Sequence, residues 1–250
     1  MIKKVLKYNN QMRVAGGGAR TKVNKVRSVT VFFDIGGTLL GSYDLCETIA
    51  RRLVKNWPNE KAYQLVEKSF RAVYTSVRDS PKFLSVQDMI AATLKSLARE
   101  HAYPDKSSQS REIYFEAFLN KSSLFPEVIT VLGELRDKGV RMIIASDSDL
   151  EIMEKELDRY GLNIFFADKV LSGSVKCYKP SDAFINHLKQ YMPTQVGRYY
   201  FVGDADVDVQ SGKKLGITSV LVDRKNTGLD FGADYVIHDL RELLPILGLR

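Results

Sequence analysis

The chain has 250 residues, 44% hydrophobic and 27% charged, which predicts one large domain or a core domain that carries an insertion. No apolar run approaches the ~18–20 residues that span a bilayer, and the two cysteines lie far apart. We therefore expect a reduced, cytoplasmic protein without a sulfur-bound metal cluster. The formal net charge of +7 arises from residues 1–28, a predicted flexible extension with eight basic and no acidic residues. The remainder carries about −1, so the folded body gives no reason to expect a nucleic-acid partner.

The first apolar stretch, VTVFF over residues 29–33, predicts a strand buried on both faces of a parallel sheet. Asp34 follows it directly, and Gly36 and Gly37 let the backbone turn sharply and approach a ligand. Open α/β sheets bind their ligands at the carboxyl ends of their strands. Asp34 is therefore either a ligand-binding carboxylate or an ordinary turn residue. Polar residues at the ends of other strands would favour the first interpretation.

Residues 43–121 show helical periodicity and no convincing buried strand. The spacing of apolar residues between prolines predicts helices over residues 45–57, 60–79, 85–100 and 111–120. Ser85 followed by Asp88 resembles a capping box at the start of the third helix. The segment is therefore predicted to be an all-helical insertion, and its aromatic residues are expected to form its own core.

Strands and helices alternate from residue 125 onwards. Apolar runs predict strands at residues 140–145, 169–171, 199–202, 218–222 and 235–237. Intervening helices are expected to end near residues 138, 160, 191, 215 and 247. Repeated strand–helix units form a parallel sheet with helices on both faces, so we expect an α/β, Rossmann-like core over residues 29–42 and 122–250.

Polar side chains follow three of the predicted strands: Asp34, Ser146 and Asp204. In a parallel sheet these strand ends meet at one edge, where gathered carboxylates repel one another unless a cation joins them. Asp34, Asp204 and Asp208 offer hard oxygen ligands that suit Mg²⁺. The Ser146 hydroxyl can bind a phosphate oxygen, and Lys179 can bind either that group or Asp34.

Four segments resemble, in order, the four motifs of the haloacid dehalogenase superfamily. They are FDIGGTL (33–39), IIASDSD (143–149), KCYKPSDAF (176–184) and FVGDADVD (201–208). The resemblance covers about residues 29–222, and the insertion over residues 43–121 is similar to the helical cap of that superfamily. It implies a Mg²⁺-dependent, phosphatase-like hydrolase that acts through an aspartyl-phosphate intermediate on a small phosphorylated metabolite.

The resemblance also assigns roles to particular residues. Asp34 would be the nucleophile, and Lys179 would hold it in register with the phosphate. The implied metal ligands are Asp34, the Gly36 backbone carbonyl, Asp204 and Asp208. The implied phosphate-binding residues are Gly37, Thr38, Ser146, Asp147 and Lys179. On the residues alone, Ser146 could instead cap the next helix, and Asp147 could face solvent.

One position departs from the family pattern. Phosphatases of this superfamily usually carry a second Asp two residues after the nucleophile, where it protonates the leaving alcohol and later activates water. Here that position is Gly36, which can offer a carbonyl to a metal but cannot transfer a proton. General acid–base help is worth ~10²–10⁴-fold. We therefore expect slow hydrolysis of ordinary monoesters unless Asp147, a cap residue or water substitutes, or the substrate has a good leaving group, such as an acyl phosphate.

Two alternative functions follow from the same departure. A dehalogenase or a phosphonatase does not need that acid, although Asp204 and Asp208 argue against a metal-independent dehalogenase. A phosphonatase would need a Schiff-base lysine in the cap, for which the candidates are Lys55, Lys61 and Lys68. The third reading is a non-catalytic phosphate-binding module, which Gly36 alone supports. The sequence predicts neither a particular substrate nor an oligomeric state.

Overall fold

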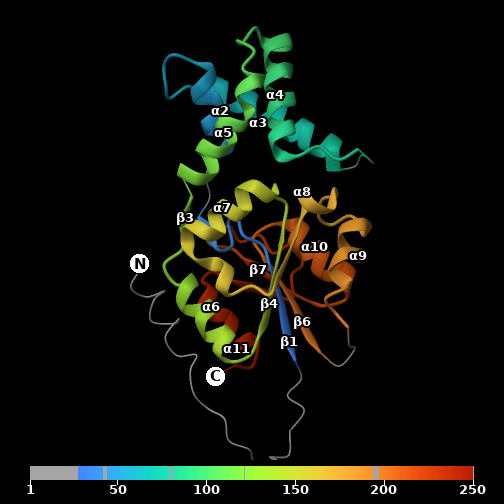
Figure 1. Cartoon of the computed structure of the whole chain (residues 1–250). Coiled ribbons are helices and arrows are strands. Elements are labelled where there is room, and N and C mark those ends of the chain that lie inside the picture. The colour runs from blue at the N-terminus through green and yellow to red at the C-terminus, as the bar shows by residue number, and fades with distance from the viewer. Residues whose placement is uncertain are drawn as a thin grey trace, which may run out of the picture.

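The computed structural model describes residues 28–41, 44–78, 80, 82–120, 122–193 and 197–249. The extension predicted over residues 1–28 therefore lies outside the described residues, apart from its last position. Figure 1 shows a sheet with helices on both faces and a separate group of helices above it. Among the described residues, no helix has both the length and the hydropathy that crossing a membrane requires.

Six strands form one sheet, and every neighbouring pair in it is parallel. In spatial order they are β5 (Asp168–Leu171), β4 (Arg141–Ser146), β1 (Val29–Phe33), β6 (Arg198–Gly203), β7 (Thr218–Val222) and β8 (Tyr235–Ile237). Phe33 of β1 lies opposite Ile144 of β4 and Val202 of β6. The strand order reverses beside β1, so the carboxyl ends of β1, β4 and β6 form the crevice where such sheets bind ligands.

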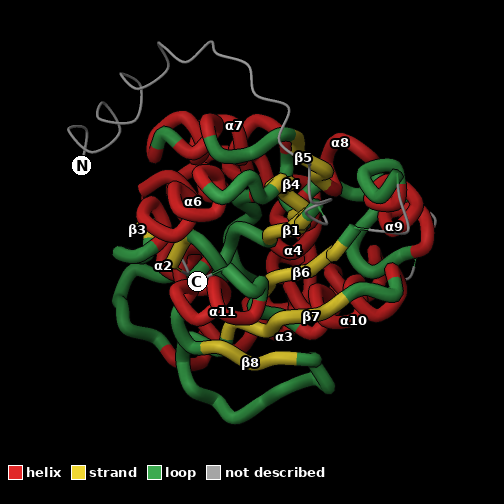
Figure 2. The backbone as a smooth tube through the Cα atoms, turned by 90° about the horizontal axis from the view of Figure 1, so that it is seen from below, coloured by secondary structure: helices red, strands yellow, loops and turns green. Residues whose placement is uncertain are grey.

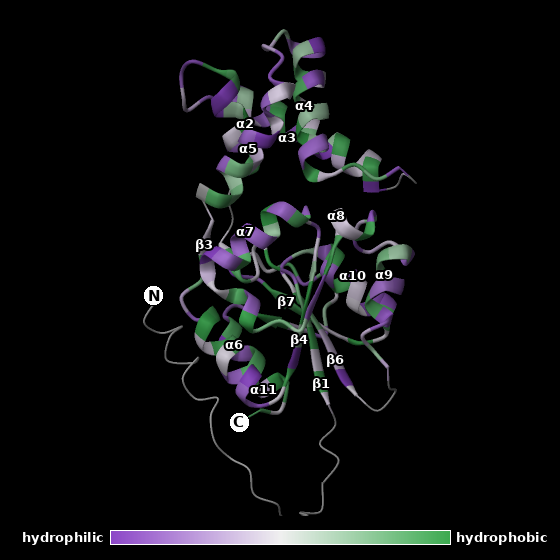
Figure 3. Ribbon diagram, in the orientation of Figure 1, coloured by the Kyte–Doolittle hydropathy of each residue, from purple (hydrophilic) through white to green (hydrophobic). Residues whose placement is uncertain are grey.

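Both faces of the sheet are covered, which explains why β1 is buried along its whole length and why β4, β6 and β7 are mainly apolar. One face packs on α6 (Val128–Asp137), α7 (Leu150–Tyr160) and α11 (Leu243–Ile246), and it includes Val31 and Phe33. The other includes Phe32 and Phe201 and packs on α9 (Asp182–Lys189), with α10 (Asp206–Leu215) beside it. Figure 2 shows the two groups of helices on opposite sides of the strands, and Figure 3 shows that these helices carry both apolar and polar stretches. The predicted α/β class is confirmed.

Four helices and a π-helical turn form the cap, which joins β1 to the rest of the core. They are α2 (Leu45–Leu53), α3 (Glu60–Arg78), α4 (Val86–His101), α5 (Ser110–Phe115) and the turn Glu116–Asn120, with a 3₁₀ turn at Ser107–Gln109. Their apolar residues, including Ile49, Val66 and Ile90, form a cluster distinct from the sheet core. The chain enters and leaves the cap through β2 (Leu40–Gly41) and β3 (Ser123–Leu124), which pair in antiparallel fashion.

Several element ends differ from the predictions for local reasons. α2 ends at Leu53 rather than near residue 57, because the backbone becomes extended at Val54. Trp57 instead packs its ring against Arg51, whose Cζ lies 4.9 Å from the ring centroid. The helix expected from residue 180 begins at Asp182, because Ser181 is its N-cap and accepts the Phe184 N–H at 3.3 Å. Short elements that were not expected include α8 (Ser172–Val175), the 3₁₀ turn at Leu162–Ile164, and the strands β2 and β3. The helix predicted over residues 239–247 begins as a 3₁₀ turn at Leu240–Glu242 and continues as α11.

Side chains of the core form hydrogen bonds with the segment of the cap where α4 begins. Ser85 caps this helix as predicted, since its hydroxyl accepts the Asp88 N–H at 3.0 Å. The carboxylate of Asp149, at the start of α7, accepts the backbone N–H groups of Val86 at 3.3 Å and Gln87 at 3.1 Å. Tyr178 donates its hydroxyl proton to the Leu84 carbonyl at 2.7 Å. These contacts hold the cap against the carboxyl edge of the sheet.

Candidate active site

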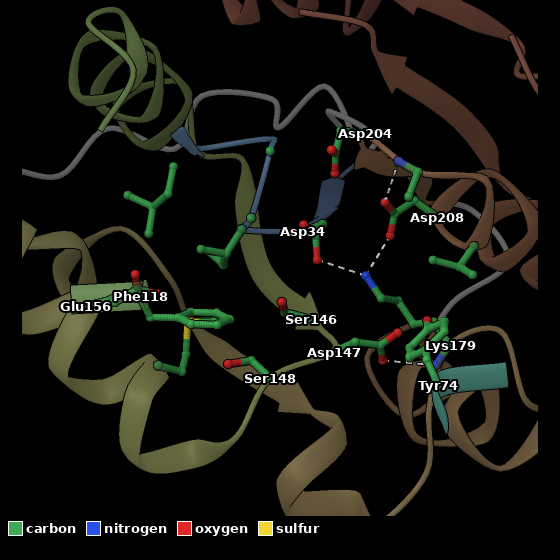
Figure 4. Close-up of a pocket in the computed structure, with 17 residues that line it drawn as sticks. Asp34, Tyr74, Phe118, Ser146, Asp147, Ser148, Glu156, Lys179, Asp204 and Asp208 are labelled. Carbon is green, nitrogen blue, oxygen red and sulfur yellow. Dashed lines mark hydrogen bonds and ion pairs between the residues drawn. The ribbon is translucent and has the colours of Figure 1, made fainter. Parts of the chain in front are cut away.

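A cavity of about 350 Å³ lies where the carboxyl ends of β1, β4 and β6 meet the cap. The cap contributes Tyr74 from α3 and Phe118 from the π-helical turn (Figure 4). The site residues predicted from the sequence line this cavity, with the exception of Thr38: Asp34, Gly36, Gly37, Ser146, Asp147, Lys179, Asp204 and Asp208. Segments separated by most of the chain therefore converge on one cavity.

Lys179 lies between two of the carboxylates, as the dashed lines in Figure 4 show. Its Nζ is 2.8 Å from Asp34 Oδ1 and 2.6 Å from Asp208 Oδ1. The side chains of Lys179 and Asp208 are each 2% exposed. Burial lowers the pKa of Lys179, but the carboxylates of Asp208, Asp34 and Asp147 together hold this pKa well above its ordinary value. Lys179 is therefore a buried cation that fixes the orientation of Asp34.

Three carboxylates at this end of the cavity can share one cation. Asp34, Asp204 and Asp208 each offer an oxygen, and these atoms lie within 4.8 Å of one another. Burial raises the pKa of Asp208 to about 6 against the opposing charge of Lys179. Burial and the neighbouring charges of Asp34 and Asp208 also raise the pKa of Asp204. One lysine cannot neutralise these groups, and their hard oxygen donors fit a divalent ion such as Mg²⁺.

Two glycines make room for the carboxylates. A Cβ at Gly37 would overlap the Asp204 carboxylate, and Gly37 also has a φ of +76°. A Cβ at Gly203 would overlap the carboxylate of Asp208, whose Oδ2 accepts the Ala205 N–H at 3.1 Å. The close approach expected of Gly37 is therefore to a side chain of the protein. Its backbone N–H donates to the Leu40 carbonyl at 2.8 Å, so this group is not available to a phosphate.

The remaining predicted phosphate-binding residues have different environments. Ser146, at the end of β4, is 5% exposed and lines the cavity. Asp147 accepts the Lys179 backbone N–H through Oδ1 at 3.0 Å, whereas its Oδ2 is buried without a hydrogen-bond partner among the described residues. Burial raises the pKa of Asp147 to about 7. The Thr38 hydroxyl is also buried and unpartnered, but Thr38 does not line the cavity, so its role stays a prediction.

The sequence reasoning missed one polar residue of the cavity. Glu156 lies on α7, is 2% exposed and lines the cavity. Its Oε1 has no hydrogen-bond partner among the described residues. Burial raises the pKa of Glu156 to about 7, with Ser122 and Arg159 acting in the opposite direction. The signal that could have found it is helical spacing, because Met153 and Leu157 place the same face of α7 in the interior.

The titration of Glu156 should make stability depend on pH. As pH rises above its ordinary pKa of 4.5, the unfolded chain loses the proton while the folded protein keeps it up to about pH 7. The free energy of unfolding should therefore fall through this window, by up to about 3 kcal/mol. Urea unfolding at pH 4.5 and 7.5 should show a larger loss in the wild type than in Glu156→Gln, which keeps only the part that Asp147, Asp204 and Asp208 contribute through their own raised pKa values. The exposed Glu154→Gln variant is the matched control, and equal pH dependence in all three proteins would contradict the prediction.

The fold and the cavity define an α/β enzyme whose site lies beneath an inserted helical cap. Residues 29–216 match the family of haloacid dehalogenase-like hydrolases. The chain belongs to this family, which confirms the resemblance seen in its four motifs.

Curated relatives and solved structures agree with this assignment. Pyrophosphatase PpaX of Halalkalibacterium halodurans is 24% identical over 229 residues, which cover 88% of this chain and 97% of the relative. Phosphoglycolate phosphatase of Pseudomonas putida is 27% identical over 232 residues, which cover 86% of this chain and 78% of the relative. The structure of L-2-haloacid dehalogenase of Xanthobacter autotrophicus has the same fold, with a TM-score of 0.67 and 16% identity. The match covers 88% of this chain and 98% of the dehalogenase. The chain is therefore a hydrolase with phosphatases among its sequence relatives.

Proposed function

We propose that the protein is a Mg²⁺-dependent phosphatase that acts on a small phosphorylated metabolite through a covalent intermediate on Asp34. The observation that carries the proposal is the buried Lys179, which bridges Asp34 and Asp208 with Asp204 beside them. The phosphatases among the sequence relatives support the same reaction class. The cytoplasm remains the expected compartment, supported by two cysteines that are both free thiols.

Asp34 is positioned to act as a nucleophile. Lys179 holds its Oδ1 at 2.8 Å, which leaves the second carboxylate oxygen for attack on phosphorus. The new bond joins that oxygen to phosphorus as the bond to the leaving oxygen breaks, and water then hydrolyses the aspartyl phosphate. Lys179 and the Ser146 hydroxyl are the side chains that we assign to the phosphate oxygens.

The residues that would hold Mg²⁺ are Asp34, Asp204, Asp208 and the carbonyl of Gly36. The bound ion would offset the repulsion between carboxylate and phosphate and stabilise the charge of the transferred group. Tyr74 and Phe118 of the cap would exclude bulk water from the cavity.

Asp147 is the residue that we assign to the proton transfer missing at Gly36. Its Oδ1 is fixed by the Lys179 backbone, and its buried Oδ2 has no partner among the described residues. With a pKa raised to about 7 by burial, the group can give a proton to the leaving oxygen. A phosphonatase is disfavoured, because none of the candidate lysines lines the cavity: Lys55, Lys61 and Lys68.

Addition of Mg²⁺ should both start phosphate release from an activated aryl phosphate and raise the melting temperature. At a concentration of 100 times Kd, a ligand bound only by the folded state stabilises it by about 2.7 kcal/mol. Asp204→Asn should lose both effects, because it removes one of the clustered ligands. Asp206→Asn should lose neither, because Asp206 lies in the same motif but does not line the cavity. Equal responses of the two variants, or release that persists in EDTA, would refute the metal assignment.

A further inference from the structure

The cavity has a second polar end that the proposed reaction does not use. Figure 4 shows Glu156 on the opposite side of the cavity from Asp208 and Lys179. Phe118 and Met153 line the same cavity and are apolar. A molecule whose phosphate lies at the carboxylate cluster would therefore extend past apolar side chains toward a buried carboxyl group.

Glu156 is incompletely paired in the free protein. Its Oε1 has no hydrogen-bond partner among the described residues, although the Ser122 hydroxyl lies close enough to lower the pKa of Glu156. A buried acceptor without a partner is costly, and a donor supplied by a ligand recovers that cost. Lys179 is the one basic side chain among the described residues that line the cavity, and it is engaged by Asp34 and Asp208. The charge of Arg159 lowers the pKa of Glu156, but Arg159 does not line the cavity, so no basic side chain among the described lining residues meets a ligand at this end.

We propose that Glu156 binds a protonated amine at the far end of the substrate, so that the preferred substrate is a small phosphate ester of an amino alcohol. This inference rests on the proposed phosphatase function and deepens it. The phosphate lies at the carboxylate cluster, a short hydrocarbon spacer contacts Phe118 and Met153, and the ammonium group donates to Glu156. The cavity volume of about 350 Å³ suits a molecule of this size.

The same arrangement disfavours acidic substrates. An ester with a carboxylate at its far end, such as phosphoglycolate, would bring a second negative charge to Glu156 without a basic side chain to receive it. We therefore expect this cavity to prefer a substrate with a positively charged far end, whereas the Pseudomonas putida relative is named for an acidic substrate, phosphoglycolate.

Calorimetric titration with alkylphosphonates tests the subsite directly, because these compounds keep the phosphate-like group and are not phosphate esters. The probes are 2-aminoethyl-, 3-aminopropyl- and 4-aminobutylphosphonate, each compared with the alkyl and carboxyalkyl phosphonates of the same length, with Mg²⁺ present. The best amine should bind at least about tenfold more tightly than its alkyl counterpart, as expected for a charged hydrogen bond. The carboxyalkyl compound should bind more weakly than either.

Glu156→Gln keeps the size of the side chain and removes its charge. It should weaken binding of the amine by about tenfold and leave the affinity for the alkylphosphonate unchanged, whereas Glu154→Gln on the same helix should change neither. Equal binding of amine and alkyl probes to the wild type would overturn the subsite and leave the proposed function standing. An equal loss for both probes in Glu156→Gln would show that Glu156 is only structural. Failure of every phosphonate and of inorganic phosphate to bind would overturn both proposals.

Discussion

Replacement of Asp34 by asparagine should reduce Mg²⁺-dependent phosphate release by at least about 10⁴-fold, the scale of loss when a covalent nucleophile is removed. An amide oxygen is a poor nucleophile and cannot form the acyl phosphate. Asparagine has nearly the same shape and can still accept the hydrogen bond that Lys179 makes at 2.8 Å, so the fold should persist. The measurement is the steady-state release of the aryl alcohol, with mass spectrometry of acid-quenched protein to detect covalent phosphate.

The matched control is Asp206→Asn. Asp206 is the first residue of α10 and accepts a hydrogen bond from Gln210 at 3.3 Å. It should retain both turnover and the covalent phosphate. Substantial activity in a folded Asp34→Asn protein would remove the nucleophile assignment, and covalent phosphate on any other residue would redirect it.

Asp147→Asn should produce a loss that depends on the leaving group. Turnover of alkyl phosphates should fall by about 10²–10⁴-fold, because a poor leaving group needs a proton as its bond to phosphorus breaks. Turnover of an activated aryl phosphate should change little, because that leaving group departs as an anion. Asparagine can still accept the Lys179 backbone N–H, so the geometry of the lysine is kept. Parallel measurements of kcat for both substrates separate proton transfer from a general loss of structure.

Gly36→Asp should restore much of the lost alkyl phosphate turnover in the Asp147→Asn protein and raise that of the wild type. Gly36 lies in the cavity, and its φ is outside the left-handed region, so an aspartate can occupy this backbone without strain. The same substitution should leave aryl phosphate hydrolysis nearly unchanged. No gain in a folded Gly36→Asp protein, or an equal loss for both substrates in Asp147→Asn, would contradict the assignment of proton transfer.

The residues at the carboxyl edge of the sheet could be predicted from the sequence, because short local patterns at the strand ends determine them. A polar residue at or just after the end of a buried strand lies at one edge of the sheet: Asp34 and Asp204 follow such strands, and Ser146 is the last residue of β4. Parallel pairing then brings the ends of β1, β4 and β6 together. Lys179 follows no strand, and it was placed at the site only through its motif. In the structure, Lys179 is buried between Asp34 and Asp208, whose negative charges balance its positive charge.

The far end of the cavity was not predictable in the same way. Phe118 and Glu156 reach it from the cap and from α7, and their meeting depends on how the cap packs against the core. Helical periodicity gives the inward face of each element but not the angle between elements. The short β2–β3 pair that sets the connection has only two residues in each strand, too few for a periodic signal. Substrate choice thus resides in the part of the molecule that depends on tertiary packing.

The contact between Asp149 and the first amides of α4 has a consequence for turnover. The cap helix begins in part on an acceptor supplied by the core, through the Val86 and Gln87 N–H groups. Separation of the two parts exposes these donors and the carboxylate together, and water can satisfy all of them. Such an exchange of partners changes the free energy little, because each hydrogen bond is replaced rather than lost. Under the proposed function, this exchange of partners would let the cap separate from the core and inorganic phosphate leave after each cycle.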